Sequence, residues 1–293
     1  MTAAAPLGLR RGAEALADPL PPLLAEASHL AATVQLGEHG RRRPGMGNEF
    51  WQYRPAHAGD SARMIDWRRS ARTDGHYVRE KEWQAAQSVQ IWVDPAQSMG
   101  FRGDDSRPTK RDRAATLALA LSILLIRGGE RVGMADASMP PRTGEVQLNR
   151  LATRLALEAT EADYGAPEAR AFLTGARALF LSDFLGDPTA IEAALTEAAD
   201  RGVRGALVQV LDPVEESFPF DGRTIFESMS GALRFESRKA GSLRDRYLDR
   251  LAERKDHLST LARRTGWQFT THHTDSPAPA ALLWLYHALG QVR

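Results

Sequence analysis

The sequence contains no cysteine. That absence excludes a disulfide framework, a thiolate nucleophile and a Cys-ligated metal site. It also fits the cytoplasm, which is the compartment we expect. Long hydrophobic runs are missing too, since no stretch reaches the roughly 18 consecutive apolar residues that a transmembrane helix requires. Arg10 and Arg11 are not followed by an apolar segment, so the sequence predicts no signal peptide.

An excess of charge and the motifs of familiar enzymes are also lacking. The 38 basic and 37 acidic residues leave a formal net charge of +1, so no overall field favours nucleic acid. The zinc motif HExxH, the nucleophile motif GxSxG and the phosphate-binding P-loop do not occur. His272 and His273 follow each other in a predicted strand and point to opposite faces, so at most one could join a cluster. We therefore expect a protein that is not an enzyme.

What the sequence does contain is an alternation of strand and helix patterns. Of its 293 residues, 43% are hydrophobic, which is in the range of folded globular domains. Short β-rich runs predict strands at 89–93, 131–135, 178–181, 206–211 and 267–271. Helices are predicted at 112–127, 146–157, 188–199, 243–264 and 277–289. This alternation predicts an α/β fold with a doubly wound, mostly parallel sheet of the Rossmann type.

The chain is expected to divide into three segments. Residues 1–17 predict a flexible tail. Residues 18–83 are expected to form an N-terminal helical and β appendage, with a helix that begins at Asp18 and Pro19. Residues 84–293 contain the α/β domain, into which a β-hairpin at 223–227 and 232–236 is inserted.

The segment 41–83 interleaves basic and aromatic residues. Ten basic and five acidic residues lie between Arg41 and Lys81. Such interleaving is typical of a nucleic-acid surface. It is equally typical of arginines that pair with Asp60 and Asp66 and stack on indole rings. We favour the second interpretation, because the acids are interspersed among the bases.

Two predicted strands end in residues that carry side-chain oxygens. The run 89–93 is followed by Asp94 and Ser98, and the run 178–181 is followed by Ser182 and Asp183. Ligand sites of open α/β sheets lie beyond the carboxyl ends of the strands. We therefore expect a binding crevice at this edge of the sheet.

A family resemblance rests on the residues just before the first strand. The motif GMGNEF at 45–50 and the motif RMIDWRRSAR at 63–72 resemble the signature of the bacterial "domain of unknown function 58" family. The residues that carry this signature segment are Gly59, Asp60, Arg63, Asp66, Trp67, Ser70 and Arg72. The resemblance covers about residues 35–290 and implies a von Willebrand factor A-like fold. Because members typically occur beside MoxR-type AAA+ ATPases, it also implies an adaptor that joins such an ATPase to a client protein.

The von Willebrand A-like fold in turn implies a metal-ion-dependent adhesion site. Such a site holds Mg²⁺, an ion that prefers oxygen ligands at about 2.1 Å, and its open position takes a carboxylate from a partner protein. By resemblance, Asp94 matches the first acid, Ser98 the second hydroxyl and Asp183 the acid after the third strand. Thr143, which precedes the second amphipathic helix, is the candidate for the expected threonine.

Ala96 departs from this pattern, because it stands where the first serine ligand is expected. A water could replace the lost hydroxyl and leave a weakened Mg²⁺ site. Alternatively the site is vestigial and Asp94 only caps the following turn. The sequence leaves both alternatives open.

The leading functional hypothesis is a non-enzymatic protein-binding adaptor with a degenerate adhesion site. One alternative is a Mg²⁺-dependent phosphoester hydrolase, which would need a nucleophile or a second metal beside Asp94 and Asp183. The other is nucleic-acid binding through the basic segment, which we consider unlikely. Under the adaptor hypothesis, Asp66→Ala and Trp67→Ala are expected to destabilise the fold, and Asp183→Ala is expected to spare it.

Overall fold

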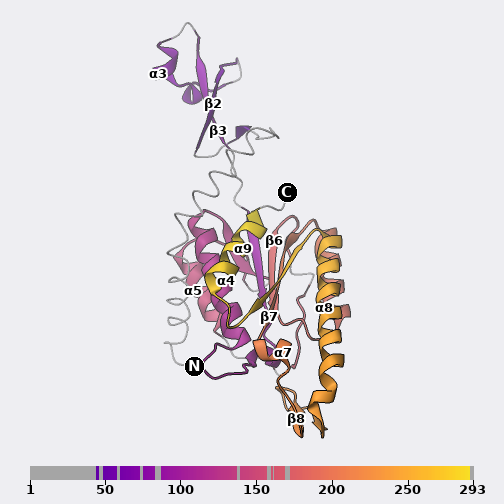
Figure 1. Ribbon diagram of the computed structural model, residues 1–293. Coiled ribbons are helices and arrows are strands. Elements are labelled where there is room, and N and C mark those ends of the chain that lie inside the picture. Colours follow the sequence, from indigo (N-terminus) through magenta and orange to yellow (C-terminus); the bar gives the residue numbers. More distant parts are fainter. Residues whose placement is uncertain are drawn as a thin grey trace. The chain divides into compact units, whose positions relative to one another are not determined.

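The computed structural model describes residues 44–45, 49–57, 60–72, 75–82, 87–136, 139–156, 160, 162–168 and 172–290. The described residues up to 82 belong to one compact unit and those from 87 onward to another (Figure 1). The predicted tail 1–17, the predicted helix after Asp18 and the signature residue Gly59 lie outside the described residues.

The C-terminal unit is built on a five-stranded sheet in which all paired strands are parallel. Its strands are β4 (Ser88–Val93), β5 (Arg131–Met134), β6 (Arg177–Ser182), β7 (Arg204–Leu211) and β10 (Gln268–His273). Their order is β10-β7-β6-β4-β5, so the direction of winding reverses between β4 and β6. In open sheets such a reversal opens a crevice at the carboxyl ends of the two strands. The predicted α/β fold with a parallel sheet is confirmed.

Helices cover both faces of this sheet (Figure 1). One face carries α4 (Lys110–Arg127), α5 (Glu145–Leu155) and α9 (Ala278–Gly290), and the other carries α6 (Pro188–Asp200) and α8 (Arg244–Thr265). Because both faces of the sheet are covered, the central strands are buried along most of their length and do not alternate between buried and exposed residues. On the α6 and α8 side, Trp92, Phe180 and Trp267 form an aromatic core, with the ring centroids of Phe180 and Trp267 4.8 Å apart.

Local signals set the ends of the helices. Asp187 accepts a hydrogen bond from the Thr189 N–H, and Pro188 occupies the first turn of α6, as the Asp-Pro pair predicts. Gly266, with φ 72°, ends α8 in the left-handed region. All ten predicted strands and helices of this unit have observed bounds within two residues of the prediction. The short helix α7 (Pro213–Ser217) was not predicted.

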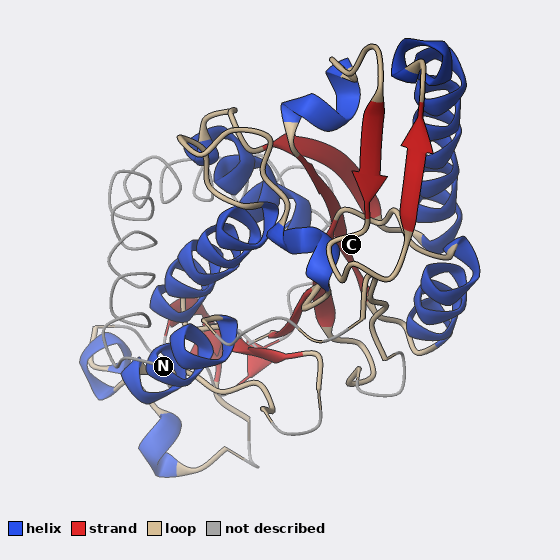
Figure 2. Cartoon of the chain, turned by 90° about the horizontal axis from the view of Figure 1, so that it is seen from below, coloured by secondary structure: helices blue, strands red, loops and turns tan. Residues whose placement is uncertain are grey.

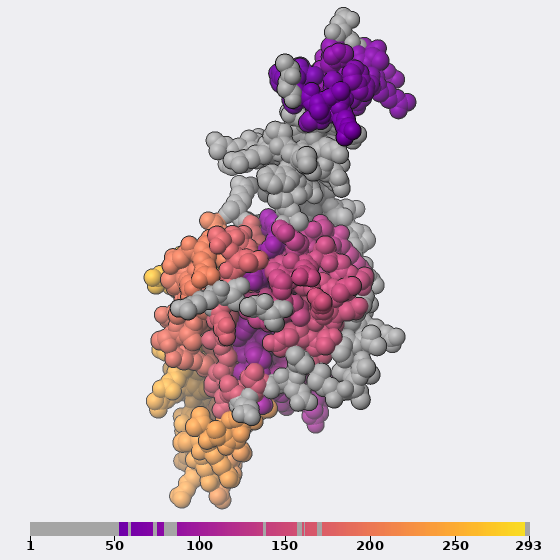
Figure 3. Space-filling view, turned by 180° about the vertical axis from the view of Figure 1, so that it is seen from behind, coloured from indigo at the N-terminus to yellow at the C-terminus, as the bar shows by residue number. Residues whose placement is uncertain are grey.

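The predicted hairpin is present as β8 (Thr224–Glu227) paired with β9 (Arg234–Ser237). It lies beside the first turns of α8 (Figure 2). In the space-filling view, the hairpin and the start of α8 form a protruding orange lobe (Figure 3). This lobe carries a group of exposed apolar side chains, namely Ile225, Met229, Leu233 and Phe235 at 45–67% exposure.

The N-terminal unit contains a small antiparallel sheet. Its strands β1 (Pro44–Gly45), β3 (Tyr77–Glu82) and β2 (Glu49–Pro55) lie in that order. Between β2 and β3 the chain forms a 3-10 turn (Ala62–Met64) and the one-turn helix α3 (Trp67–Ser70). No helix among the described residues of either unit is long and apolar enough to cross a membrane.

Gly205 is required by the close approach of two central strands. A Cβ at this position of β7 would lie 1.8 Å from the Ala178 carbonyl oxygen of β6. We expect Gly205→Ala to lower the free energy of unfolding by about 2 to 3 kcal/mol, the upper part of the range for overpacked cores. Denaturant unfolding measures this loss. Gly290→Ala is the control, since nothing lies within 4 Å of its added methyl, and equal effects of the two variants would contradict the predicted packing.

Candidate functional site

An aspartate follows every strand of the parallel sheet within two residues. These residues are Asp94 after β4, Asp136 after β5, Asp183 after β6, Asp212 after β7 and Asp275 after β10. Because the carboxyl ends of parallel strands meet at one edge, this edge is rich in carboxylates. The environment of each carboxylate decides what the edge can bind.

Asp94 lies at the reversal of the sheet, and each of its side-chain oxygens accepts a hydrogen bond from the protein. Its side chain is 1% exposed and accepts from the Ala96 N–H at 2.9 Å and from the Ser182 hydroxyl at 2.6 Å. Burial raises the pKa of Asp94, and the hydrogen bonds from Ser182 and Ala96 offset part of that effect. Asp94 therefore fixes the loop after β4, the role that the vestigial alternative gave it.

Asp183 is paired with a buried lysine that sequence patterns did not reveal. Lys110, the first residue of α4, is 1% exposed, and its Nζ lies 2.8 Å from Asp183 Oδ2 and 2.7 Å from Glu215 Oε1. Burial by itself lowers the pKa of Lys110, but Asp183 and Glu215 outweigh it, so the pKa is raised and the amine stays charged. Lys110, Asp183 and Glu215 form what we call the ion cluster.

The second oxygen of each carboxylate in the ion cluster is held by the backbone. The Leu185 N–H donates to Asp183 Oδ1 at 3.1 Å, and the Asp212 N–H donates to Glu215 Oε2 at 2.8 Å. Asp212 and Glu215 form a capping box at the start of α7. Both carboxylates therefore have fixed orientations before any ligand arrives.

Ser98 lies on the turn after β4 and is 9% exposed. Its hydroxyl has no hydrogen-bond partner among the described residues. Its N–H donates to the Asp163 carbonyl at 3.0 Å, which joins this turn to the loop 162–165. Ser98 is therefore close to the predicted crevice.

Thr143 is not brought to this edge. After β5 the chain turns back, because the Met134 N–H donates to the Met139 carbonyl and Val132 pairs antiparallel with Arg142. Thr143 follows Arg142 on this return and lies toward the amino end of β5, exposed to solvent. Its assignment as a ligand is wrong. The loop that approaches Asp94 is instead 162–165, where a Cβ on Gly165 would lie 2.3 Å from Asp94 Oδ1.

An aromatic pocket of about 470 Å³ lies next to the ion cluster. Phe101 and Glu215 line it, and the Phe101 ring centroid is 5.6 Å from the Lys110 Nζ. The other side chains of this pocket are Val214, Phe218, Phe220, Phe226, Phe235, Leu243, Arg246, Tyr247 and Arg250. The carboxyl edge thus combines a buried charged cluster with an apolar hollow.

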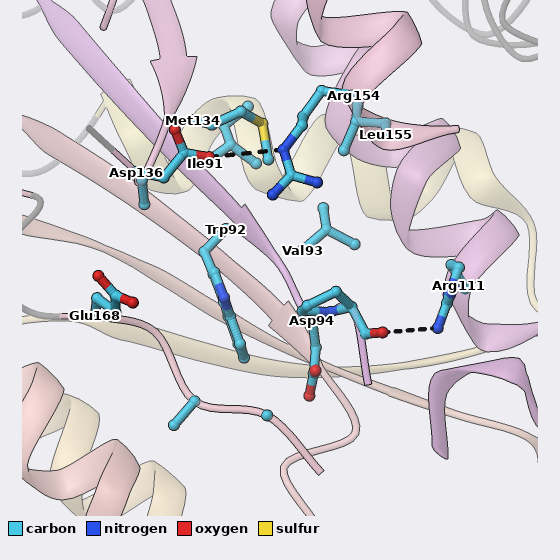
Figure 4. A pocket seen from close by; sticks show the side chains of 14 residues that line it. Ile91, Trp92, Val93, Asp94, Arg111, Met134, Asp136, Arg154, Leu155 and Glu168 are labelled. Carbon is cyan, nitrogen blue, oxygen red and sulfur yellow. Dashed lines mark hydrogen bonds and ion pairs between the residues drawn. The ribbon is translucent and has the colours of Figure 1, made fainter. Parts of the chain in front are cut away.

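A second pocket, of about 230 Å³, lies between the ends of β4 and β5 (Figure 4). Arg154 and Asp136 form an ion pair at 3.7 Å in it, and Arg111 donates to the Pro95 carbonyl at 3.0 Å. Its two arginines are therefore occupied by protein groups, and we assign this pocket no ligand.

The signature segment holds its own fold together through two acids. The two terminal guanidinium nitrogens of Arg54 each donate a hydrogen bond to an Asp60 oxygen at 2.6 Å. This pairing holds the pKa of Asp60 well below its usual range. The Asp66 side chain caps α3 by accepting a hydrogen bond from the Arg69 N–H, and it accepts a second one from the Tyr53 hydroxyl, both at 3.0 Å. The prediction that an arginine pairs with Asp60 is confirmed, and that arginine is Arg54.

The remaining signature residues divide into a buried serine and exposed side chains. The Ser70 hydroxyl donates a hydrogen bond to the Asp66 carbonyl at 2.8 Å and accepts one from the Tyr77 N–H at 3.0 Å. Arg63 and Arg72 are exposed, and Trp67 is 56% exposed with its edge against His76. Among the described side chains, Arg69 stacks on a phenol ring, with its guanidinium carbon 4.3 Å from the centroid of Tyr53.

A model of the family "Protein of unknown function DUF58" matches residues 52–257, which is more than half of the chain. The chain belongs to this family. The resemblance inferred from the signature segment is therefore confirmed.

Relatives of this DUF58 chain include "Uncharacterized protein Rv1480" of Mycobacterium tuberculosis and "Uncharacterized protein Mb1516" of Mycobacterium bovis. Each is 27% identical over 263 residues, which cover 82% of this chain and 78% of the relative. Among solved structures, it is similar to an aerotolerance-related membrane protein from Bacteroides fragilis, with TM-score 0.43 and 16% identity. It is also similar to BatB from Bacteroides thetaiotaomicron, with TM-score 0.41 and 14% identity. Both matches cover 70% of this chain and 100% of the other, and their scores are too low to inform function.

The side chains at the carboxyl edge do not fit the Mg²⁺ site that the resemblance implies. The Lys110 ammonium lies against Asp183, both side-chain oxygens of Asp94 accept hydrogen bonds from the protein, and Ala96 offers only a fully buried methyl. The unpartnered hydroxyl of Ser98 is one feature that would suit a metal. Within the described ranges, no group of three or more His, Asp or Glu side chains is placed to hold an ion.

The sequence carried one signal for the ion cluster. A lysine in the first turn of a helix opposes the helix dipole, so its presence at the start of α4 indicates a nearby carboxylate. The pairing also changes the expectation for Asp183→Ala, because this variant would remove a partner of a buried charge. The structure therefore predicts that Asp183→Ala destabilises the fold.

Asp66 and Trp67 are adjacent but differ in burial and contacts, which gives a matched test of the signature segment. We expect Asp66→Ala to cost the N-terminal unit about 1 to 2 kcal/mol, since it removes a helix cap. Trp67→Ala should cost less than about 1 kcal/mol because the indole is largely exposed. Hydrogen exchange of the β3 amides measures both, and faster exchange in Trp67→Ala than in Asp66→Ala would contradict this order.

The two adjacent histidines point to different surroundings, as predicted. His273 Nε2 lies 2.7 Å from Glu216 Oε2, whereas His272 is buried and its Nε2 lacks a partner among the described residues. Burial, with Arg113 and His273 near by, lowers the pKa of His272 from 6.5 to about 4. Between pH 6.5 and pH 4, His272 is therefore protonated in the unfolded chain but neutral in the folded chain. The free energy of unfolding falls as the pH decreases through this range.

We expect His272→Gln to remove that pH-dependent loss. Between about pH 7 and about pH 5, the wild type should lose about 2 kcal/mol more unfolding free energy than this variant. Denaturant unfolding at the two pH values measures the difference. Parallel losses in both proteins would show that His272 is protonated in the folded state.

Proposed function

We propose that this DUF58 chain is a non-enzymatic protein-binding adaptor of the von Willebrand A-like kind. Its partner surface would be the carboxyl edge of the parallel sheet. The observation that carries this proposal is the aromatic pocket together with the exposed apolar hairpin beside it. Exposed apolar surface of this extent, bordered by charged residues, is typical of a protein-interaction site.

The hairpin supplies apolar side chains that the protein leaves in contact with water. Leu233 and Phe235 are 67% and 56% exposed, and Ile225 and Met229 are close to half exposed. Phe226, from the same hairpin, stacks on Phe218 with ring centroids 5.9 Å apart. The pocket therefore has a firm aromatic floor and an exposed apolar rim, the combination that anchors the central side chains of protein interfaces.

The charges around the aromatic pocket favour an acidic partner segment. Arg246 and Arg250, one turn apart on α8, line the pocket and are exposed. In the described part of the chain neither forms an ion pair. An extended or helical segment with an apolar anchor and a neighbouring carboxylate would satisfy both features.

The partner we propose is a MoxR-type AAA+ ATPase, with a client protein as the second binding partner. This choice rests on the family resemblance. The sheet order and the acidic strand ends are compatible with the von Willebrand A-like kind of module. Since such ATPases act where ATP is available, the proposal puts the encounter in the cytoplasm.

The two alternatives have less support from the side chains. A Mg²⁺-dependent hydrolase would need free carboxylates, whereas Asp94 and Asp183 are engaged by protein donors. Nucleic-acid binding would rely on the cations of the signature segment, and one of them, Arg54, is held by Asp60.

Substitutions in the aromatic pocket should weaken binding of a purified MoxR-type ATPase. We expect Phe235→Ser and Arg250→Glu each to raise the dissociation constant at least about tenfold, because they remove an apolar anchor and invert a rim charge. Biolayer interferometry with immobilised adaptor measures the change. Val146→Ser is the control, since Val146 is 70% exposed on α5 and does not line this pocket. Unchanged dissociation constants in both pocket variants would contradict the proposal that the partner binds at this surface.

A further inference from the structure

The ion cluster places a cation where the winding of the sheet predicts a ligand. Lys110 Nζ lies within 2.8 Å of two carboxylates that come from different elements, the end of β6 and the helix α7. The remaining direction faces the Phe101 ring, 5.6 Å from Nζ to the centroid. The positive charge is therefore surrounded by two anionic groups and one aromatic face.

Burial of this ammonium is possible only because the cluster is complete. Lys110 and Asp183 are each 1% exposed, so solvent contributes little to their stabilisation. A charged amine in that setting needs ionic partners and aligned hydrogen bonds. The backbone N–H groups of Leu185 and Asp212 supply the alignment, because they hold the outer oxygens of the two carboxylates.

A second feature agrees with a resident ammonium. Ala96, where the family pattern has a hydroxyl ligand, is 0% exposed and packs in the interior. A divalent ion would lose an oxygen ligand there. An ammonium on Asp183 and Glu215 needs no ligand from position 96.

We infer that the Lys110 ammonium is the resident cation of this strand-end site, in place of a divalent metal, so that the fold and its carboxyl edge are independent of metal ions. A divalent ion that entered the intact cluster would meet a fixed positive charge. Removal of that charge, with the side chain that carries it, should leave two oriented carboxylates and an open space between them. Loss of Lys110 should therefore create a metal site that the wild type lacks.

The test uses Mn²⁺ alone as the probe and compares the full-length wild type with Lys110→Ala and with the double variant Lys110→Ala/Asp183→Asn. Electron paramagnetic resonance of free Mn²⁺ measures binding, and thermal unfolding in Mg²⁺ and in EDTA measures the effect on stability. The wild type should bind no Mn²⁺ at the cluster and should unfold at the same temperature in both buffers. Lys110→Ala should unfold at a lower temperature, bind Mn²⁺ at least about tenfold more tightly than the wild type and recover part of its stability in Mg²⁺.

The double variant should lose both the Mn²⁺ binding and the recovery, because one ligand is gone. One-to-one Mn²⁺ binding by the wild type that disappears in the double variant would overturn the inference. A folded Lys110→Ala that binds no Mn²⁺ would also overturn it. If Lys110→Ala does not fold, the wild-type titration alone decides. Because no partner protein enters this test, its failure is distinct from failure of the proposed adaptor function.

Discussion

The burial of one lysine charge constrains the carboxyl edge of the sheet. Lys110 joins the start of α4 to the end of β6 and to α7, residues separated by 73 and 105 positions in the chain. A charge in the interior is tolerated only when its partners are oriented and satisfied. This requirement fixes the turn after β6 through Leu185 and the capping box of α7 through Asp212. The geometry of three loops thus follows from one ion cluster.

The same cluster shapes the surface that the protein offers. Glu215 of the ion cluster also lines the aromatic pocket, and Phe101 of the pocket lies 5.6 Å from the Lys110 Nζ, so a rigid charged interior supports the wall of an apolar hollow. The hairpin then extends this hollow with exposed apolar side chains. Preorganised walls of this kind reduce the ordering cost of binding. Under the proposed function, these walls would accept a segment of the partner protein.

The fold was largely predictable because its signals are local. Asp187 and Pro188 mark the start of α6, and Gly266 marks the end of α8, by conformational preferences of a few adjacent residues. The position of Asp94 and Asp183 at one edge followed from strand polarity alone. Thr143 was misplaced because the chain reverses after Met134 through pairing that no local pattern indicates. Lys110 was missed for a related reason, since its partners are distant in sequence and meet it only in the folded chain.

An ammonium and a divalent ion at this edge would have different consequences for recognition. A metal with an open coordination position can bridge to a carboxylate of a partner, and its occupancy varies with the supply of ions. A lysine held by two carboxylates and covered by Phe101 is always present and is out of reach of solvent. Under the proposed function, the lysine would hold the edge in shape, and contact with a partner would fall to the groups around it. The exposed Arg246 and Arg250 then become the cations that an acidic partner segment would meet, and the aromatic side chains become its anchor.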